Sequence, residues 1–447
     1  MNVILLSGGS GTRLWPLSND VRSKQFLKIL KRKDGVRESM AQRMYRMIKD
    51  IDRDSKITIA TSQNQVASIH NQLGTDIGIS IEPCRRDTFP AISLASAYLK
   101  KNGVSDNEPI VVCPVDPYVD ENYFECLKEL SDEAKKGESN LTLMGIEPTC
   151  PSEKYGYIIP LTKDSVSEVK EFKEKPSRVV AEEYIKQGAL WNGGIFAYKL
   201  GYVLDVAEKE FGTSDYDALL KKYSELKKIS FDYAVVEKEK RIKVVRFNGL
   251  WKDLGTWDTL LEVMAEQTSG NSTAVECENT HIINELPIPL IAMGIKDVVI
   301  VASPDGILVA DKEKSSNLKN YATEVALRPM YEKREWGEYK VLEYDKQPDN
   351  NNSLTKHLVI KAGKNISYQK HHKRDEIWTI INGEGLLLLD GKVKKVTRGD
   401  IAYIKREQLH AMKAISDLHF VEVQIGDDLI EEDIERFEWP TEIDERK

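Results

Sequence analysis

Residues 2–13 read NVILLSGGSGTR, a short apolar run that ends in closely spaced glycines. The run predicts a buried strand over 2–7, and the glycines allow backbone N–H groups to approach a phosphate chain without Cβ atoms in the way. Arg13 adds a positive charge directly after this loop. A tight glycine turn beside a surface arginine is the alternative, because the pattern is neither a P-loop nor a clean GxGxxG fingerprint.

The segments that follow alternate between helix and strand patterns. Helices are predicted over 38–49 and 88–101, and strands over 56–61 and 109–113. Alternation at this spacing is typical of an α/β layer with a mainly parallel sheet. We therefore expect a Rossmann-like α/β domain over residues 1–265.

The pattern changes in the last third of the chain. Short apolar runs broken by turns predict a short β-rich connector over 266–328, which ends in a helix at 313–327. Closely spaced strand-like segments follow, and the turns between them carry hairpin signals such as Asn382-Gly383. That profile is typical of a small all-β barrel or jelly roll over 329–447.

The composition excludes several classes of function. The 447 residues are 41% hydrophobic and 30% charged, which predicts a globular chain, and the net charge of −8 provides no basic field for nucleic acid or anionic lipid. No stretch approaches the roughly 18 apolar residues of a transmembrane helix, and the N-terminus lacks the basic region of a signal peptide. We expect a cytoplasmic enzyme that binds neither nucleic acid nor membrane.

Cysteine and histidine are distributed differently. The five cysteines are widely spaced and include no CxxC pair, which fits a reducing compartment and predicts neither a disulfide framework nor a zinc ribbon. Five of the seven histidines lie in the last 91 residues. This clustering indicates a C-terminal module with its own chemistry.

Seven sequence blocks carry a resemblance to a known family. They occur in the family's order over about 260 residues, and they are 6–18 with 23–27, 82–91, 114–116, 148–151 with 155–158, 172–176, 191–196 and 251–257. The chain resembles the sugar-1-phosphate nucleotidylyltransferases. Trp15 and Lys24-Gln25-Phe26 are similar specifically to the mannose-1-phosphate guanylyltransferases, also called GDP-mannose pyrophosphorylases.

The resemblance implies transfer of GMP from GTP to mannose 1-phosphate, with release of pyrophosphate, by a homo-oligomer. Such chemistry needs positioning and charge neutralisation more than covalent groups. By resemblance, Arg13 and Lys24 would act as catalytic cations, and Asp116 and Asp253 would hold Mg²⁺, a hard cation that prefers carboxylate oxygens. The loop residues that would cradle the nucleotide phosphates are Gly8, Gly9, Ser10, Gly11 and Thr12.

The resemblance also implies residues for the base and the sugar. Those implied on the nucleotide side are Glu82, Pro83 and Arg86, and those implied to hold the sugar phosphate are Gly156, Glu174, Lys175 and Asn192. The chain departs from the family's usual pattern at Ser23 (usually Pro), Asp87 (usually Asn) and Pro117 (usually His). Asp87 brings a negative charge near the nucleotide region, which leaves the base and sugar preference open.

The C-terminal module contains the spacing G-x5-Q-x-H-x4-E-x6-G from Gly363 to Gly383. This spacing resembles the first cupin motif, with Gln in place of the first His, and His410 falls in a segment similar to the second motif. Gln369, His371, Glu376 and His410 would then form a mixed N/O site for a divalent metal such as Zn²⁺.

The surrounding block from Gln369 to Trp378 resembles the type II phosphomannose isomerase half of bifunctional enzymes. The resemblance implies interconversion of mannose 6-phosphate and fructose 6-phosphate, a proton transfer between C1 and C2 with a metal polarising the carbonyl. Arg374 would contact the substrate phosphate. Lys373 and Ile377 replace the family's usual His, and Lys405-Arg406-Glu407 replaces its Pro-x-Gly, so a cupin without catalytic activity stays open.

Two alternatives to the leading interpretation remain. One is a nucleotidylyltransferase for another sugar 1-phosphate with a non-catalytic cupin. The other is a regulatory subunit that binds nucleotide sugars without turnover, and it would be expected to lack the charged groups that the chain retains.

Overall fold

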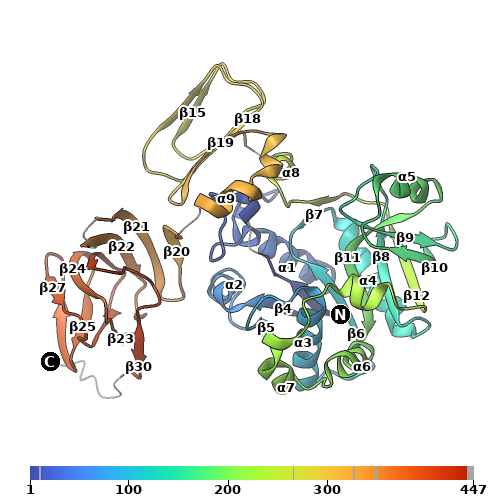
Figure 1. Cartoon of the computed structure of the whole chain (residues 1–447), viewed down its shortest axis with the longest axis horizontal. Coiled ribbons are helices and arrows are strands. Elements are labelled where there is room, and N and C mark those ends of the chain that lie inside the picture. The colour runs from blue at the N-terminus through green and yellow to red at the C-terminus, as the bar shows by residue number, and fades with distance from the viewer. Residues whose placement is uncertain (10–11, 265, 326–327, 348–350, 440–447) are drawn as a thin grey trace. The chain divides into compact units, whose positions relative to one another are not determined.

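The computed structural model describes residues 1–9, 12–264, 266–325, 328–347 and 351–439 (Figure 1). These residues form two compact units. The first comprises Met1–Leu14, Ser18–Gln267 and Ala310–Lys319, and the second comprises Trp15–Leu17, Thr268–Val309 and Asn320–Lys447. Ser10 and Gly11, two of the loop residues predicted to bind nucleotide, lie outside the described residues.

The first unit alternates strands and helices along the chain. Its strands are β1 Asn2–Leu6, β2 Leu30–Lys31, β3 Arg37–Glu38, β4 Lys56–Ser62, β5 Gly78–Glu82, β6 Pro109–Pro114, β7 Pro117–Val119, β8 Leu141–Ile146, β9 Gly156–Pro160, β10 Val166–Lys173, β11 Leu190–Lys199, β12 Ile242–Phe247 and β13 Trp251–Asp253. Its α-helices are α1 Met40–Ile51, α2 Val66–Leu73, α3 Thr88–Lys101, α4 Glu121–Lys136, α5 Arg178–Lys186, α6 Leu200–Phe211, α7 Tyr216–Lys221 and α8 Trp257–Leu261. Shorter helical turns are η1 Thr12–Leu14, η2 Lys24–Phe26, η3 Gln63–Gln65, η4 Tyr223–Glu225, the π-helix η5 Asp232–Val236 and η6 Lys314–Asn317.

Local sequence explains where several helices begin and end. Ser39 and Gln42 form a capping box at the start of α1, in which each side chain bonds to the other residue's backbone N–H. Helix α4 ends at Gly137, which has the left-handed conformation that glycine adopts without a Cβ penalty.

Nine strands form the central sheet, in the order β5-β4-β1-β6-β11-β8-β12-β10-β9. Strands β5, β4, β1 and β6 are parallel neighbours, and β11 runs antiparallel to β6. The carboxyl ends of the four parallel strands therefore meet at one sheet edge, where ligands bind in open α/β folds.

Alternate residues of the buried strands enter two separate cores. Val3 and Leu5 of β1 belong to a core that includes α1 and α4, whereas Ile4 belongs to a core that includes α3 and α6. Helices therefore cover both faces of the sheet, which explains why β1 lacks a polar face. The α/β fold expected for the N-terminal part is confirmed.

Short strands form the connector of the second unit. These are β14 Thr268–Ser269, β15 Ser272–Val275, β16 His281–Asn284, β17 Leu290–Met293, β18 Val298–Ser303 and β19 Gly306–Asp311, whose last residues lie in the first unit. Strands β14, β16 and β18 are parallel neighbours, and β15 runs parallel to β17. Ile282, Ala292 and Ile300 fill the small core of this connector.

The expected helix over 313–327 is wrong in its extent. The described residues instead contain the 3₁₀ turn η6, Lys314–Asn317, and the short helix α9, Lys319–Val325. The hydroxyls of Ser315 and Ser316 donate to the carbonyls of Lys312 and Glu313. Serine side chains that bond locally to the backbone compete with regular helix hydrogen bonds, which accounts for the break.

The C-terminal part is a sandwich of two antiparallel sheets. Its strands are β20 Tyr331–Lys333, β21 Gly337–Asp345, β22 Asn352–Ile360, β23 Tyr368–Lys370, β24 Arg374–Asn382, β25 Gly385–Leu389, β26 Lys392–Val396, β27 Ile401–Ile404, β28 His410–Ala414, β29 Leu418–Gly426 and β30 Glu435–Phe437. The sheet orders are β20-β21-β22-β29-β24-β27 and β26-β25-β28-β23-β30. The expected cupin-like jelly roll is confirmed.

Among the described residues, no helix is long and apolar enough to cross a membrane.

Candidate active sites

The glycine-rich loop leaves the sheet at the carboxyl edge of the parallel strands. β1 ends at Leu6, and the Ser7 N–H donates to Ala60 O on the neighbouring strand, 2.9 Å away. A Cβ added at Gly8 or Gly9 would meet no atom within 4 Å, and Gly9 has φ +150°, which side chains rarely adopt. The backbone at Gly8 and Gly9 is thus open to a ligand. Thr12 begins the turn η1, which contains Arg13.

Two predicted cations and two predicted carboxylates converge beside this loop. Lys24 Nζ lies 2.7 Å from Asp116 Oδ2. Pairing of β13 with β7 places Asp253 opposite Pro117, next to Asp116. Arg13 reaches the same place, because a Cβ added at Gly255 would lie 3.1 Å from Asp253 Oδ1 and 3.3 Å from Arg13 Nη1.

The electrostatics of this cluster suit a divalent cation. Burial raises the pKa of Asp253, and the neighbouring Asp116 carboxylate raises it further, while Lys24 and Arg13 lower it. Two carboxylates held this close favour a positive charge between them. Their oxygens are the ligands that Mg²⁺ prefers, so the donor set fits that metal.

Glu82 lies at the carboxyl end of β5 and is buried. The Tyr223 hydroxyl donates to its Oε2 at 2.7 Å, and burial raises the pKa of the Glu82 carboxyl to about 7. Pro83 is exposed, and Arg86 Nη2 donates to the Ser224 carbonyl. The predicted nucleotide residues therefore flank the start of α3.

Asp87 stands where the family usually has Asn, and it caps α3. Its Oδ1 accepts a hydrogen bond from Thr88 N at 2.8 Å, and its φ is +70°. Asn and Asp both carry a side-chain oxygen that can accept this bond, so the departure from the family preserves the helix cap.

The predicted sugar-phosphate residues form one cluster. A Cβ added at Gly156 would lie 2.5 Å from Glu174 Oε2 and 3.3 Å from Asn192 Cβ. Lys175 Nζ pairs with Glu174 Oε1 at 2.5 Å. Glu174 Oε2 is buried and has no hydrogen-bond partner among the described residues, which leaves it available to a ligand hydroxyl.

Sequence reasoning missed Asp232, which joins this cluster. Asn192 Nδ2 donates to Asp232 Oδ1 at 2.6 Å. Burial raises the pKa of the Asp232 carboxyl to about 6, and the Glu174 carboxylate contributes. Asp232 begins the π-helix η5, an irregularity found often at functional sites, and no sequence motif marks it.

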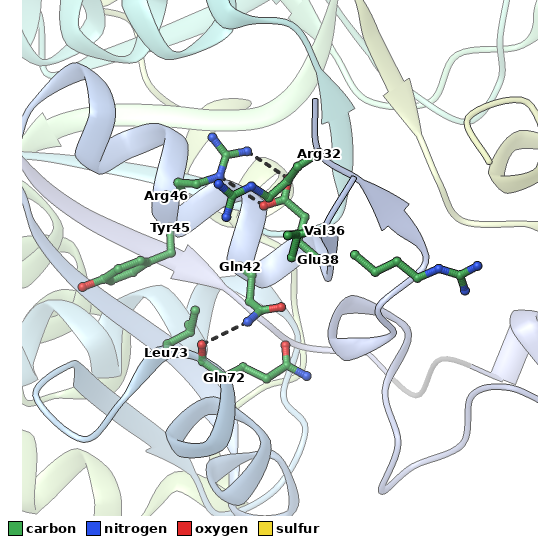
Figure 2. A pocket seen from close by; sticks show the side chains of 9 residues that line it. Arg32, Val36, Glu38, Gln42, Tyr45, Arg46, Gln72 and Leu73 are labelled. Atoms are coloured by element: carbon green, nitrogen blue, oxygen red, sulfur yellow. Dashed lines mark hydrogen bonds and ion pairs between the residues drawn. The ribbon is translucent and has the colours of Figure 1, made fainter. Parts of the chain in front are cut away.

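A cavity of about 230 Å³ in the first unit contains none of the predicted site residues (Figure 2). Arg32, Arg37 and Arg46 contribute to its lining. Arg46 donates to both carboxylate oxygens of the buried Glu38, at 2.9 and 3.1 Å. The charge of Arg46 is therefore offset within the protein.

Three predicted metal ligands meet inside the cupin. One ligand atom from each of His371, Glu376 and His410 lies within 4.8 Å of the others, and all three residues are buried. The Nδ1 atoms of the two histidines face backbone carbonyls, Asp433 O at 2.6 Å and Gln408 O at 2.9 Å. If each Nδ1 donates, each Nε2 presents its lone pair to the centre, the arrangement typical of metal-bound histidine.

The protonation of the site agrees with metal binding. Burial lowers the pKa of His371 to about 4, despite the attraction of Glu376, and burial also lowers the pKa of His410. His410 Nε2 is buried without a hydrogen-bond partner among the described residues. The three residues fit a divalent metal. Gln369 lies beside them with its amide nitrogen 3.3 Å from His371 Nε2.

Arg374 is placed differently from the expected phosphate-binding residue. Its side chain is only 2% exposed and pairs with Glu376 Oε1 at 2.9 Å. Its Nη1 donates to Ile430 O at 3.0 Å, and its Nη2 lies 3.3 Å from His371 Nε2. The guanidinium thus holds the ligand carboxylate and the chain after β29.

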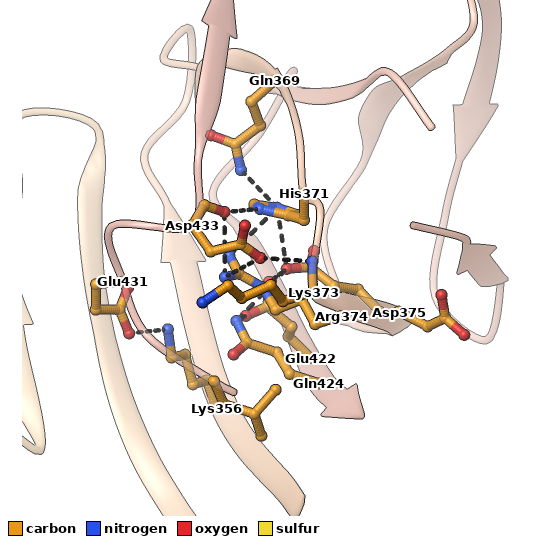
Figure 3. Close-up of polar contacts among 12 residues, drawn as sticks. Lys356, Gln369, His371, Lys373, Arg374, Asp375, Glu422, Gln424, Glu431 and Asp433 are labelled. Carbon is orange, nitrogen blue, oxygen red and sulfur yellow. Dashed lines mark hydrogen bonds and ion pairs between the residues drawn. The ribbon is translucent and has the colours of Figure 1, made fainter. Parts of the chain in front are cut away.

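A second buried group beside the metal ligands was not found from sequence. Trp378 Nε1 lies 3.1 Å from both Glu376 Oε2 and Glu422 Oε2. Burial raises the pKa of the Glu422 carboxyl to about 7, and the Glu376 charge adds to the shift. Gln424 Nε2 donates to Glu422 Oε1 at 2.8 Å (Figure 3).

Two protein families match this chain, and each match covers one of the two sites. A family model described as nucleotidyl transferase matches residues 2–270, and one described as mannose-6-phosphate isomerase C-terminal matches residues 324–439. The solved structure of a Thermus thermophilus protein, described as a mannose-1-phosphate geranyltransferase, superposes with a TM-score of 0.61 at 27% identity, over 72% of this chain and 98% of that one.

Several curated proteins are similar along nearly the whole chain. A mannose-1-phosphate guanylyltransferase of Salmonella montevideo is 30% identical over 97% of this chain and 98% of its own length. The xanthan biosynthesis protein XanB of Xanthomonas campestris pv. campestris is 29% identical over 97% of both chains.

Proposed function

This chain belongs to the nucleotidyl transferase family, among mannose-1-phosphate guanylyltransferases with a mannose-6-phosphate isomerase C-terminal region, and we propose that it makes GDP-mannose from GTP and mannose 1-phosphate. A phosphate oxygen of mannose 1-phosphate attacks the α-phosphorus of GTP. The bond from the α-phosphorus to the bridging oxygen breaks, and pyrophosphate leaves. The observation that carries this proposal is the convergence of Arg13, Lys24, Asp116 and Asp253 beside the glycine loop.

Each part of the cluster has a role in this reaction. The positive charges of Arg13 and Lys24 offset charge that develops on the transferring and leaving phosphates, and backbone N–H groups of the open loop bind phosphate oxygens. Asp116 and Asp253 would hold Mg²⁺, which when bound neutralises phosphate charge and orients the substrates. Because these charges are already in place before the reaction, no solvent has to reorient around the charge that develops.

The remaining residues select the substrates. Glu82, with its neighbours Pro83 and Arg86, contacts the base of the nucleotide. At the sugar, Glu174 accepts hydrogen bonds from hydroxyls and Asn192 donates to them. Lys175 adds a positive charge for the sugar phosphate. A buried acceptor without a partner, as in Glu174 Oε2, disfavours sugars that lack the matching hydroxyl.

The test is formation of GDP-mannose by the full chain and by Asp253→Asn. Removal of one carboxylate is expected to lower kcat/KM by about 100-fold or more, the scale on which single electrostatic groups act in catalysis. Asp132→Asn, at an exposed position on α4, is the matched control. Equal activity of Asp253→Asn and the wild type would contradict the proposed role of Asp253 in holding Mg²⁺. A panel of sugar 1-phosphates and nucleotides tests which substrates the enzyme accepts.

A second activity is proposed for the cupin. The observation that favours it is the buried His371, Glu376 and His410 cluster. A divalent metal held there supplies carbonyl polarisation for interconversion of mannose 6-phosphate and fructose 6-phosphate. Turnover by metal-supplemented protein, lost in His410→Ala, is the expected result. If the cupin binds metal but does not interconvert the two sugar phosphates with any common divalent ion, guanylyl transfer would be the one activity still proposed.

The proposal places the protein in the cytoplasm, as a homo-oligomer that binds neither nucleic acid nor membrane. The division into domains at 1–265, 266–328 and 329–447 also belongs to the proposal.

A further inference from the structure

The segment Trp15–Leu17 packs with the connector, although the residues on both sides of it belong to the first unit. This segment follows Arg13 after one residue and precedes Lys24 by seven. It directly follows the turn η1, which contains Arg13, and residues 18–23 connect it to the turn η2, which begins at Lys24. Contacts that fix this segment therefore constrain the end of η1 directly and the start of η2 through the intervening residues.

A buried hydroxyl of the connector holds the segment. Ser303, at the end of β18, is 2% exposed, and its Oγ donates to the Pro16 carbonyl at 2.7 Å. The same Oγ accepts from the Asp305 N–H at 3.1 Å. The hydroxyl thus uses its donor on Pro16 and an acceptor site on its own turn, which fixes its direction.

A glycine of the same turn makes room for the indole ring of Trp15. Gly306 has φ +149°, and a Cβ added there would lie 2.5 Å from Trp15 Cζ2 and 2.8 Å from Trp15 Cη2. Real Cβ atoms do not approach so closely, so any larger residue would displace the ring. The turn is braced from its other side as well, because Asp305 Oδ1 accepts from Met330 N at 2.6 Å.

We propose that the turn Ser303–Gly306 is a positioning element for nucleotidyl transfer, and that Ser303 and Gly306 act through Trp15–Leu17 on Arg13 and Lys24. The inference rests on the proposed function of those cations. The hydrogen bond and the close ring contact restrict the position of this backbone segment, and misplacement of reacting groups by about 1 Å can cost about 100-fold in rate.

The experiment compares Ser303→Ala and Gly306→Ala with the wild type in steady-state GDP-mannose synthesis. Ser303→Ala leaves the Pro16 carbonyl without its donor, and kcat is expected to fall about tenfold. Gly306→Ala moves the indole ring and is expected to cost about 100-fold. Thr280→Ala is the matched control, because Thr280 is a buried connector residue whose hydroxyl also donates to backbone carbonyls, Glu278 O and Ile295 O.

A double-mutant cycle separates positioning from general destabilisation. If Ser303 acts through Arg13, Ser303→Ala lowers kcat by less than about twofold in an Arg13→Ala background, whereas a purely structural defect lowers kcat equally in both. Additive losses, or a Ser303→Ala enzyme within twofold of the wild type, would overturn the inference. Failure of the wild type to form GDP-mannose would instead reject the proposed function.

Discussion

Replacement of Arg374 by alanine tests how the cupin site is built. The Arg374 and Glu376 side chains are each 2% exposed, and they pair at 2.9 Å. Arg374→Ala removes the cation and leaves a buried carboxylate with neutral partners, and it also frees the Ile430 carbonyl that Nη1 binds. Removal of one partner of a buried ion pair costs about 3–5 kcal/mol.

The expected assay result follows from this cost. The unfolding transition of the second unit should fall by about 10 °C in Arg374→Ala, since each kcal/mol lowers Tm by about 2–4 °C in a unit of this size. Differential scanning calorimetry of the full chain measures the shift. Arg436→Ala, at an exposed position on β30, is the control and should leave Tm unchanged.

A double variant refines the test. Replacing both partners with apolar residues, Arg374→Met with Glu376→Leu, should recover much of the lost stability, because no unpaired charge remains. A loss below about 1 kcal/mol in Arg374→Ala would refute the reasoning, since a cation that faces solvent is worth that much or less. Loss of isomerase activity in Arg374→Ala would therefore not by itself identify a phosphate-binding residue.

Three further predictions concern both sites. Gly156→Ala should raise KM for mannose 1-phosphate about tenfold and leave KM for GTP within twofold, because the new Cβ would meet Glu174 Oε2. Initial rates measure both constants, and equal shifts in the two would contradict this prediction. His410→Ala should weaken Zn²⁺ affinity more than about 100-fold, a larger loss than removal of a residue that only hydrogen-bonds to a metal ligand causes. Competition with a chelator measures the affinity, and His372→Ala, at an exposed position, should leave it unchanged. The metal-free cupin should lose stability as pH falls from 6.5 to about 4, because His371 takes up a proton in the unfolded chain but not in the folded one. Denaturant midpoints that stay constant over this range would contradict the lowered pKa of His371.

Local sequence was sufficient for the parts of this protein that depend on near neighbours. Strand β1 and its glycine loop, helix α3 and the cupin strands follow from apolar periodicity and turn residues, which act over a few positions. The spacing from Gln369 to Glu376 likewise covers one short strand and the start of the next, so the order of ligand types already indicated a metal site. The family blocks identified the transferase chemistry.

The tertiary structure alone decided which distant residues meet. Tyr223 bonds to Glu82 from 141 positions away, and Ser303 bonds to Pro16 from 287 positions away. No local pattern marks such partners, because a long-range contact forms only when the packing of whole sheets repays the entropy of closing the chain. The surroundings of Arg374, which the family resemblance implied as a contact of the substrate phosphate, were likewise decided by tertiary structure. Glu376 is its neighbour two positions along β24, but the bond from Arg374 Nη1 to Ile430 O joins residues 56 positions apart, and only the packing around the strand buries the pair.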